Sequence, residues 1–373
     1  MCGITGVFAF NLVGKFSKIN VAAATKALSS RGPDFQDIHV EEWVCLGHRR
    51  LSIIDTRAVA HQPMWDNSRR WCIVFNGEIF NFRELRQQLR AEGLTFHTES
   101  DTEVLLQSYI RYGTACLNQL NGFFSFCIYD TQEQSLFLAR DRFGIKPLLY
   151  LFDQDKFLFS SEMKSLLAYG IVKDIDYNSL LAYLQLNYIP APHTIFPGVK
   201  KLMPGHWLKI KNQSIETGRY YSIPHPSVED SPPSLSYPEA QVRFKSLLET
   251  SVQRRLVADV PLGCFLSGGT DSSVIAAIAS RHQSGLHTFS IGYQDEPYFD
   301  ETTYARLVAK KINTEHTVFS LTNRDLYEHV HDVLDYADEP FADSSAIAVY
   351  ILSKQTRKHA TVALSGDGAD ELL

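Results

Sequence analysis

Residues 260–273 read Val-Pro-Leu-Gly-Cys-Phe-Leu-Ser-Gly-Gly-Thr-Asp-Ser-Ser. A short apolar strand, 261–266, runs through a glycine pair into a helix expected over 272–282. Further strands are expected at 287–291, 316–319 and 361–364, separated by a helix at 301–312 and then two more helices. Because short apolar strands alternate with helices, this half of the chain is predicted to be an α/β doubly wound parallel sheet.

The loop between the first strand and its helix is a candidate phosphate-binding site. Its two glycines can adopt positive φ, which lets successive N–H groups face an anion, and the helix N-terminus favours negative charge. Hydroxyl donors are supplied by Ser267, Ser272 and Ser273. Asp271 would repel phosphates unless a cation bridged them, so the loop implies Mg²⁺. A simple glycine turn followed by a capped helix accounts for the same residues equally well.

The first half of the chain has a different order of predicted strands and helices. Strands are expected at 37–47 and 71–76 and as a hairpin of 123–130 with 135–140, and helices at 82–92 and 101–112. Strands in runs with few helices between them predict stacked antiparallel sheets of the α+β class. Five of the 15 prolines fall within 222–238, which indicates a spacer. The expected division is a first domain over 2–215, a linker over 216–238 and a second domain over 239–373.

Composition narrows the class of protein. The 373 residues are 45% hydrophobic, and 36 basic against 42 acidic residues give a net charge of −6. This favours a globular chain of about two or three domains and argues against a nucleic-acid partner. No apolar run approaches the ~18 residues of a membrane span, and the N-terminus lacks a signal-peptide pattern. We therefore expect a cytoplasmic protein without a membrane partner; a homodimer is left open.

Cys2 stands apart from the other five cysteines, most of which lie in apolar runs and none of which has zinc-site spacing. If Met1 is removed, Cys2 carries both a thiol and a free α-amine. The reference pKa of that amine is about 7.7–8.0, so it can accept the thiol proton near neutral pH. Nucleophile and base would then lie in one residue.

Cys2 is followed by a series of motifs in fixed order. They are Met1-Cys2-Gly3-Ile4, Arg31-Gly32-Pro33-Asp34, Gly47-His48-Arg49-Arg50-Leu51-Ser52, Phe75-Asn76-Gly77-Glu78, Ser100-Asp101-Thr102-Glu103 and Arg140-Asp141-Arg142-Phe143-Gly144-Ile145-Lys146-Pro147. Over residues 1 to about 165 the chain resembles the class II glutamine amidotransferase domain, an N-terminal-nucleophile hydrolase.

That resemblance implies a role for each matching residue. Cys2 would attack the side-chain amide of glutamine, and the Asn76 side chain and Gly77 N–H would form the oxyanion hole. A sharp turn at Asn76-Gly77 would aim that N–H at the site. Arg49 would bind the substrate α-carboxylate, and Glu78 and Asp101 its α-ammonium. Each alone is more commonly structural: a hairpin turn, a surface ion pair or a helix cap.

The 267–273 loop resembles the PP-loop of ATP pyrophosphatases. Its surroundings, with Asp338-Glu339-Pro340 and Ser365-Gly366-Asp367-Gly368-Ala369-Asp370-Glu371, resemble asparagine synthetases in particular. The resemblance implies that ATP binds through Ser267, Gly268, Gly269, Asp271, Ser272, Ser273, Ser365 and Gly366, with Phe265 and Ile291 near the adenine. Asp271 and Asp370 would flank Mg²⁺-pyrophosphate, and Asp367 would be an acidic residue of the catalytic centre.

Together these resemblances imply glutamine-dependent amidation of aspartate with ATP. Two alternatives stay open: another carboxylate acceptor, such as a sugar acid in surface-polysaccharide synthesis, or a non-catalytic remnant. The family continues the last motif as Phe-Gly-Gly-Tyr, whereas this sequence ends at Leu373. We therefore expect the chain as given to retain at most the glutaminase half; whether this end is natural stays open.

Overall fold

The computed structural model describes residues 1–224 and 235–371, which form two compact units. The first unit holds Met1–Pro224 together with Asp338–Ala342, and the second holds the remaining described residues. No helix in these described ranges is both long and apolar enough to span a membrane.

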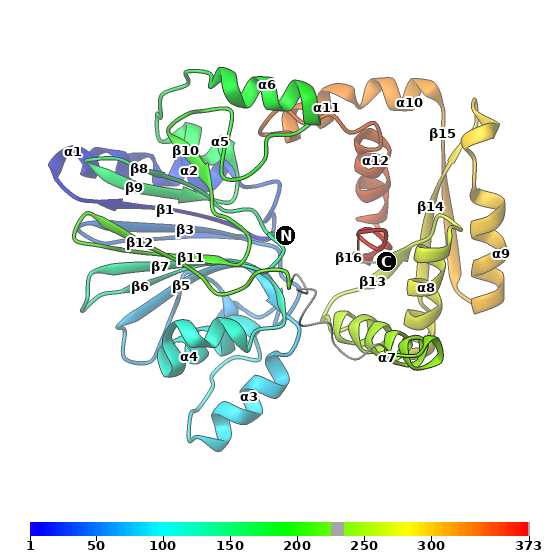
Figure 1. Cartoon of the computed structure of the whole chain (residues 1–373), viewed down its shortest axis with the longest axis horizontal. Coiled ribbons are helices and arrows are strands. Elements are labelled where there is room, and N and C mark those ends of the chain that lie inside the picture. Colours follow the sequence, from blue (N-terminus) through cyan, green and yellow to red (C-terminus); the bar gives the residue numbers. More distant parts are fainter. Residues whose placement is uncertain (225–234, 372–373) are drawn as a thin grey trace. The chain divides into compact units, whose positions relative to one another are not determined.

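The first unit contains two six-stranded sheets in which every pairing is antiparallel (Figure 1). The first sheet has the order β10-β8-β9-β1-β3-β2, and the second has the order β12-β11-β7-β6-β5-β4. The strands are β1 (Gly3–Ala9), β2 (Phe35–Val40), β3 (Val44–Arg50), β4 (Met64–Trp65), β5 (Trp71–Ile79), β6 (Gly122–Asp130), β7 (Ser135–Arg140), β8 (Leu149–Phe152), β9 (Lys156–Ser160), β10 (Val199–Lys201), β11 (His206–Lys211) and β12 (Ser214–Arg219).

Strand alternation sorts the apolar side chains of the first unit into layers. Phe157 and Phe159 of β9 belong to a core shared with the second sheet, whereas Leu158 between them packs toward helices on the outer face. The helices of this unit are α1 (Leu12–Phe16), α2 (Val21–Ala27), α3 (Phe82–Ala91), α4 (Asp101–Tyr112), α5 (Met163–Ala168) and α6 (Tyr177–Leu186). The predicted α+β class with stacked antiparallel sheets is confirmed.

Two local predictions in this unit were wrong. Residues 37–47, expected as one strand, form parts of β2 and β3 with a break at 41–43. The strand expected to end at residue 76 continues through β5 to Ile79, so the chain does not turn at Asn76-Gly77. Pairing with β6 extends from Trp71 to Ile79, and these ladder hydrogen bonds keep the backbone extended.

The second unit is built on a four-stranded parallel sheet of order β15-β14-β13-β16. Its strands are β13 (Leu262–Phe265), β14 (His287–Tyr293), β15 (Glu315–Leu321) and β16 (Val362–Leu364), and its helices are α7 (Tyr237–Arg255), α8 (Thr270–His282), α9 (Thr302–Ile312), α10 (Asn323–Glu328), α11 (Val330–Tyr336) and α12 (Ala346–Thr356). The order reverses at β13, as in doubly wound sheets. The predicted parallel fold is confirmed, with three helices rather than two between β15 and β16.

The structure describes part of the segment expected as a linker, 216–238. Its first residues complete β12, and its last two begin α7, where Ser236 and Glu239 form a capping box. Residues 225–234 of this expected linker lie outside the described residues. The division at 2–215, 216–238 and 239–373 stays a prediction.

Residues 338–342 follow α11 in the sequence yet belong to the first unit. Lys164 Nζ lies 3.3 Å from an Asp338 carboxylate oxygen, and Lys201 Nζ lies 2.7 Å from a Glu339 carboxylate oxygen. The other Glu339 oxygen accepts a 3.0 Å hydrogen bond from Ile195 N. These half-buried ion pairs tie the segment to the first unit.

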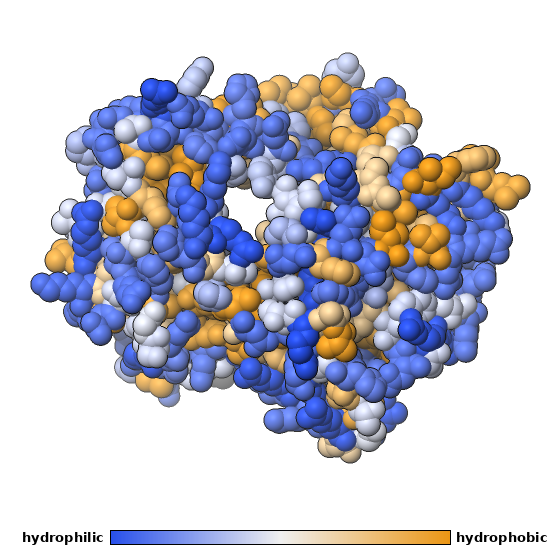
Figure 2. Space-filling view, turned by 180° about the vertical axis from the view of Figure 1, so that it is seen from behind, coloured by the Kyte–Doolittle hydropathy of each residue, from blue (hydrophilic) through white to orange (hydrophobic). Residues whose placement is uncertain are grey.

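Hydrophilic residues are interspersed with hydrophobic ones over the face that Figure 2 shows. Several large apolar side chains of the second unit are exposed, among them Val242 and Leu247 of α7 and Leu307 of α9. The two sheets of the first unit enclose a core that contains fully buried phenylalanines.

Candidate active sites

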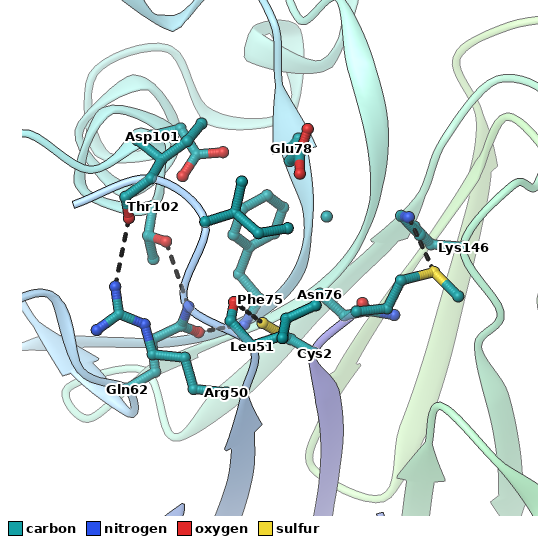
Figure 3. Close-up of a pocket in the computed structure, with 14 residues that line it drawn as sticks. Cys2, Arg50, Leu51, Gln62, Phe75, Asn76, Glu78, Asp101, Thr102 and Lys146 are labelled. Atoms are coloured by element: carbon teal, nitrogen blue, oxygen red, sulfur yellow. Dashed lines mark hydrogen bonds between the residues drawn. The ribbon is translucent and has the colours of Figure 1, made fainter. Parts of the chain in front are cut away.

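Cys2 lies at one wall of a small pocket in the first unit, directly before β1 (Figure 3). Its Sγ lies 3.6 Å from the carbonyl oxygen of Leu51. Burial raises the pKa of the thiol, although the bond to Leu51 and the charge of Arg50 act in the opposite direction. The residues that line the pocket are Met1, Cys2, Arg50, Leu51, Ile53, Ile54, Gln62, Phe75, Asn76, Gly77, Glu78, Asp101, Thr102 and Lys146.

Asn76 is completely buried on β5 and also lines the pocket. Its Nδ2 lies 3.5 Å from Ser125 Oγ, while its Oδ1 is buried without a hydrogen-bond partner among the described residues. Buried polar atoms are normally paired, and an exception points to a missing ligand or to a functional role. The amide is therefore placed to bind a polar group that enters the pocket.

Gly77 is required by close packing. A Cβ at this position would lie 2.2 Å from the carbonyl oxygen of Phe123 and 2.7 Å from Phe124 Cα. Its φ is not positive, so a turn at Asn76-Gly77 is not the reason for glycine at this position. Strand β6 comes so close to β5 here that no side chain fits.

Asp101 and Glu78 bring two carboxylates to the pocket. Asp101 is the first residue of α4, whose cap is Ser100, and its Oδ2 accepts a 3.0 Å hydrogen bond from Ile79 N. Burial raises the pKa of Asp101 to about 7, partly offset by that bond, while the neighbouring Glu78 raises it further. Figure 3 shows both carboxylates on one side of the pocket and Cys2 with Asn76 on the other.

The prediction for Arg49 needs a correction, because Arg50 lines the pocket and Arg49 does not. Successive side chains of a strand point to opposite faces, so two adjacent residues of β3 cannot both face the pocket. Arg49 donates a 2.9 Å hydrogen bond to Gln36 on β2. Arg50 is 4% exposed and donates to the backbone carbonyls of Ile54, Asp55 and Arg57.

Other pocket residues had been given no role from the sequence. Gln62 is buried, accepts from Phe75 N at 2.6 Å and donates to Thr102 Oγ1 at 3.2 Å. Lys146 enters from the loop after β7, and burial lowers its pKa. The motif at 140–147 contained Lys146, but nothing local in the sequence marks that side chain as facing Cys2.

The loop that carries Lys146 is organised by Asp141, which is 1% exposed. Its two carboxylate oxygens accept hydrogen bonds from four backbone N–H groups, those of Phe124, Phe143, Ile145 and Lys146. Asp141 thus connects the strand beside Gly77 to the loop beside Cys2.

His48 lies close to this site and is bonded to the backbone of β5. It is fully buried, and its Nε2 lies 3.1 Å from the carbonyl oxygen of Phe75. Burial lowers the pKa of His48 to about 3. The neutral ring is therefore fixed by its hydrogen bond to the backbone of β5.

The second candidate site follows β13, where the chain passes through 266–269 into α8. Gly268 has φ +94°, and a Cβ there would lie 2.6 Å from Ala305 N, so this position requires glycine. Gly269, expected to share the positive φ, is the N-cap residue with φ −65°. The expected pair of left-handed glycines is therefore reduced to one.

Hydroxyl groups gather at this loop. Ser267 and Ser272 lie with their oxygens 2.9 Å apart, and Gly269 N donates to Ser267 Oγ at 3.2 Å. Ser273 Oγ is buried and has no hydrogen-bond partner among the described residues. Asp271 lies in the first turn of α8. An N-terminus with hydroxyl donors fits the phosphates of a nucleotide.

The segment 365–370 meets this loop because β13 and β16 are neighbours. In a parallel sheet the carboxyl ends of adjacent strands lie at the same edge, and the point where the strand order reverses is the usual ligand crevice. A Cβ on Gly366 would lie 2.7 Å from Ser272 N, so the two segments are in contact. Asp367 accepts a 2.9 Å hydrogen bond from Ser365 Oγ.

The remaining predicted nucleotide residues occupy the same sheet and its loops. Phe265 ends β13 and Ile291 lies on β14, both half-buried, while Asp370 is exposed beyond β16. Within residues 1–224 and 235–371 no group of three or more His, Cys, Asp or Glu side chains is placed to bind a metal. A Mg²⁺ ion held by one or two carboxylates and by phosphates would not need such a group.

Comparison with known proteins assigns the chain to a family. Residues 1–221 match the family described as a glutamine amidotransferase domain, and residues 243–373 match the family described as asparagine synthase. The whole chain is 35% identical to a putative glutamine-hydrolysing asparagine synthetase 2 of Methanocaldococcus jannaschii and covers 75% of it. The chain belongs to the glutamine-hydrolysing asparagine synthetase family.

Two further members of this family come from Bacillus subtilis. The chain is 35% identical to its glutamine-hydrolysing asparagine synthetases 3 and 1, and in both cases the match includes 100% of the chain. It covers 63% of the first protein and 58% of the second. The chain thus spans less than two thirds of the length of these two family members.

Proposed function

We propose that this chain takes part in glutamine-dependent asparagine synthesis, with a glutaminase site around Cys2 and an ATP site at the 267–273 loop. The observation that carries the proposal is the convergence of Cys2, Asn76, Arg50, Glu78 and Asp101 on one small pocket. The thiol, the side-chain amide, the guanidinium and the two carboxylates of these residues match the groups of a free α-amino acid that carries a side-chain amide.

In the proposed glutaminase step, Met1 has been removed and the free α-amine of Cys2 accepts the thiol proton. The sulfur then adds to the side-chain carbonyl carbon of glutamine. The Asn76 amide and the Gly77 N–H stabilise the oxyanion. The C–N bond breaks, ammonia leaves with the proton, and a thioester to Cys2 remains. Water hydrolyses the thioester to glutamate and restores the thiol.

Substrate recognition is assigned to the charged walls of the pocket. Arg50 binds the α-carboxylate, in place of Arg49, because its side chain lines the pocket. Asp101 and Glu78 bind the α-ammonium from the opposite side. A bound ammonium would favour ionised carboxylates and so return the pKa of Asp101 toward its ordinary range.

The second unit is proposed to adenylate the side-chain carboxylate of aspartate: the carboxylate attacks the α-phosphorus of ATP and pyrophosphate leaves. Ammonia then attacks the acyl-adenylate and gives the amide with release of AMP. Ser267, Gly268, Gly269, Ser272 and Ser273 hold the phosphates, and Phe265, Ile291, Ser365 and Gly366 lie toward the adenine. Mg²⁺, when bound, would neutralise phosphate charge, and Asp271 and Asp370 are its proposed ligands. Asp367 is proposed as an acidic residue of the catalytic centre.

The rest of the proposal concerns organisation. The glutaminase domain is placed at 2–215, the linker at 216–238 and the synthetase domain at 239–373. A cytoplasmic location and a homodimer are part of the proposal; cell fractionation and light scattering test them.

The experiment is to incubate the chain with glutamine, with and without ATP, Mg²⁺ and aspartate, and to measure glutamate, asparagine and AMP. Glutamate release that Cys2→Ala abolishes and Cys45→Ala preserves supports the glutaminase. Asparagine and AMP formed in equal amounts support the complete reaction. Glutamate release by Cys2→Ala at the wild-type rate would refute the proposed site.

A further inference from the structure

Gln62 joins two sides of the proposed glutaminase pocket (Figure 3). It is 3% exposed, its Oε1 accepts a 2.6 Å hydrogen bond from Phe75 N, and its Nε2 donates at 3.2 Å to Thr102 Oγ1. Phe75 directly precedes Asn76 on β5, and Thr102 directly follows Asp101 on α4. One buried amide therefore connects the strand with the proposed oxyanion donors to the helix turn with a proposed ligand of the α-ammonium.

The bond to Phe75 takes the place of a strand pairing. β4 pairs with β5 in a register that sets Met64 opposite Ile73. Continuing that register by two residues places Gln62 opposite Phe75, and there the side-chain oxygen of Gln62 accepts the bond from the strand. Gln62 thus satisfies a buried backbone N–H at the edge of β5, which would be costly to leave unpaired.

The same edge of β5 carries the backbone donor that is proposed to stabilise the oxyanion. Alternate residues of a strand direct their N–H groups to the same edge, so Phe75, Gly77 and Ile79 share one. Phe75 N is bonded to Gln62, and Ile79 N donates at 3.0 Å to Asp101 Oδ2. The N–H of Gly77 lies between these two bonds, and Gly77 lines the pocket.

Oxyanion donors act only when they are accurately placed. A donor has to lie about 2.7–3.1 Å from the developing oxyanion, and a displacement of about 1 Å at a reacting group can reduce a rate by about 100-fold. β6 pairs with one edge of β5, whereas the edge that faces the pocket is held here by the side chains of Gln62 and Asp101. The placement of the donors therefore depends on these two side chains.

We infer that Gln62 is a positioning residue for the glutaminase reaction. It fixes the distance between the edge of β5, which carries the proposed oxyanion donors, and the first turn of α4, which carries Asp101. One glutamine molecule has to meet both, with its side-chain amide at β5 and its α-ammonium at α4. A side-chain amide suits this role, because it presents an acceptor and a donor at once. The inference rests on the proposed glutaminase function.

The test compares Gln62→Met and Gln62→Glu in the full chain. Methionine keeps the length of the side chain but loses both hydrogen bonds, so kcat for glutamate release should fall by about 100-fold, with a smaller change in KM for glutamine. A glutamate carboxyl can accept from Phe75 N and from the hydroxyl of Thr102, so Gln62→Glu should recover about tenfold of that loss.

A second readout reports on the oxyanion donors directly. Glutamate γ-semialdehyde is an inhibitor in which the Cys2 sulfur adds to the aldehyde carbon and the carbonyl oxygen takes up the thiol proton. That oxygen then occupies the place of the oxyanion. Gln62→Met should weaken this inhibition by about the same factor as it lowers kcat/KM, because both depend on the same donors. Inhibition by the product glutamate should change much less.

The matched control is Asp66→Ala. Asp66 Oδ1 accepts a 2.8 Å hydrogen bond from Trp71 N at the start of β5, and Asp66 does not line the pocket. The variant removes the same kind of bond from the same strand, but far along it from Gly77. It should lower the melting temperature and leave kcat and the inhibition by the aldehyde unchanged.

Three results would overturn the inference: a wild-type kcat in Gln62→Met, a loss confined to KM, or a kcat in Gln62→Glu no higher than in Gln62→Met. If Gln62→Met does not fold, Gln62→Glu and Thr102→Val decide, since the valine removes the acceptor of the Nε2 bond and keeps the shape. Lower kcat in Thr102→Val with weaker aldehyde inhibition supports the role, and wild-type values in both variants refute it. A wild-type chain that releases no glutamate would refute the proposed function itself, which is a different failure.

Discussion

Replacement of Asp101 by asparagine should remove a pH dependence that this carboxyl imposes on the use of glutamine. Burial raises the pKa of Asp101 to about 7 from a reference value of 3.8. Below that pH the free protein holds a neutral acid where the α-ammonium of glutamine should bind. The proposed ion pair then forms only in the fraction of molecules that are ionised.

The magnitude follows from that pKa. In the wild-type chain, ionisation of this carboxyl should add a factor of about ten for each pH unit to the fall of kcat/KM for glutamine below about pH 7, and Asp101→Asn should lack this added factor. The shift of about three units corresponds to about 4 kcal/mol between the two protonation states.

The same pKa has a consequence for stability. The folded carboxyl holds its proton more tightly than the unfolded one, so its stabilising effect is complete below about pH 4. That effect is lost as pH rises to about 7. Asp101→Asn should therefore weaken the fall in stability between these values.

The assay has two arms. Initial rates of glutamate release at low glutamine, measured across pH 5 to 8.5, give kcat/KM for the wild type and Asp101→Asn. Denaturant unfolding without ligand, at about pH 4.5 and 8, gives the stability difference. Asp130→Asn is the control, because Asp130 is also buried but pairs with Arg70 away from the pocket.

The reasoning fails if Asp101→Asn keeps the same slope of kcat/KM below pH 7 as the wild type. The α-amine of Cys2 also has to lose its proton, so a limb near pH 8 is expected in both proteins. Unchanged stability profiles for wild type and variant would equally contradict a raised pKa for this carboxyl.

Three further predictions concern close packing and side-chain direction. Arg50→Lys should raise KM for glutamine by about tenfold or more, whereas Arg49→Lys should change it less than about twofold; steady-state kinetics of both variants decide which guanidinium binds the carboxylate. Gly77→Ala should destabilise the protein by about 1–3 kcal/mol in urea unfolding, because its Cβ would lie 2.2 Å from a backbone oxygen, and it should lower kcat. Gly198→Ala, whose Cβ would meet nothing nearer than 3.6 Å, should be nearly neutral, and equal effects of the two alanines would contradict the packing argument. Gly366→Ala should weaken ATP binding, measured by calorimetry, by about tenfold and leave the glutaminase activity unchanged. The reason is that its Cβ would lie 2.7 Å from a backbone nitrogen at the start of α8. An unchanged affinity for ATP would show that the contact between these two segments does not matter for nucleotide binding.

Features that depend on neighbouring residues could be read from the sequence. The alternation of strands and helices after residue 261 predicted a parallel sheet, and the runs of strands before residue 160 predicted antiparallel ones; both are confirmed. Gly268 was correctly expected at a positive φ. These signals are local, because hydrophobic period and turn chemistry act over a few residues.

Features that depend on strand phase could not be read in the same way. Arg49 and Arg50 are adjacent and chemically identical, and only the pairing of β3 with β1 and β2 decides which of them faces Cys2. The dipeptide Asn76-Gly77 is compatible with a turn as well as with a strand. The strand β5 continues through it because β6 pairs with β5 along its whole length. A shift of one residue reverses every side chain in a strand, and local sequence does not set that phase.

The sequence by itself determined the two fold classes and the order of the motifs, because these follow from local periodicity and from residue types at short spacing. The tertiary structure alone decided that Lys146 and Gln62 join Cys2 at one pocket, and that Asp338 belongs with Lys164 in the first unit. These contacts join residues that lie far apart in the chain. They depend on the register and packing of whole sheets, to which every strand contributes, and no short stretch of sequence contains that information.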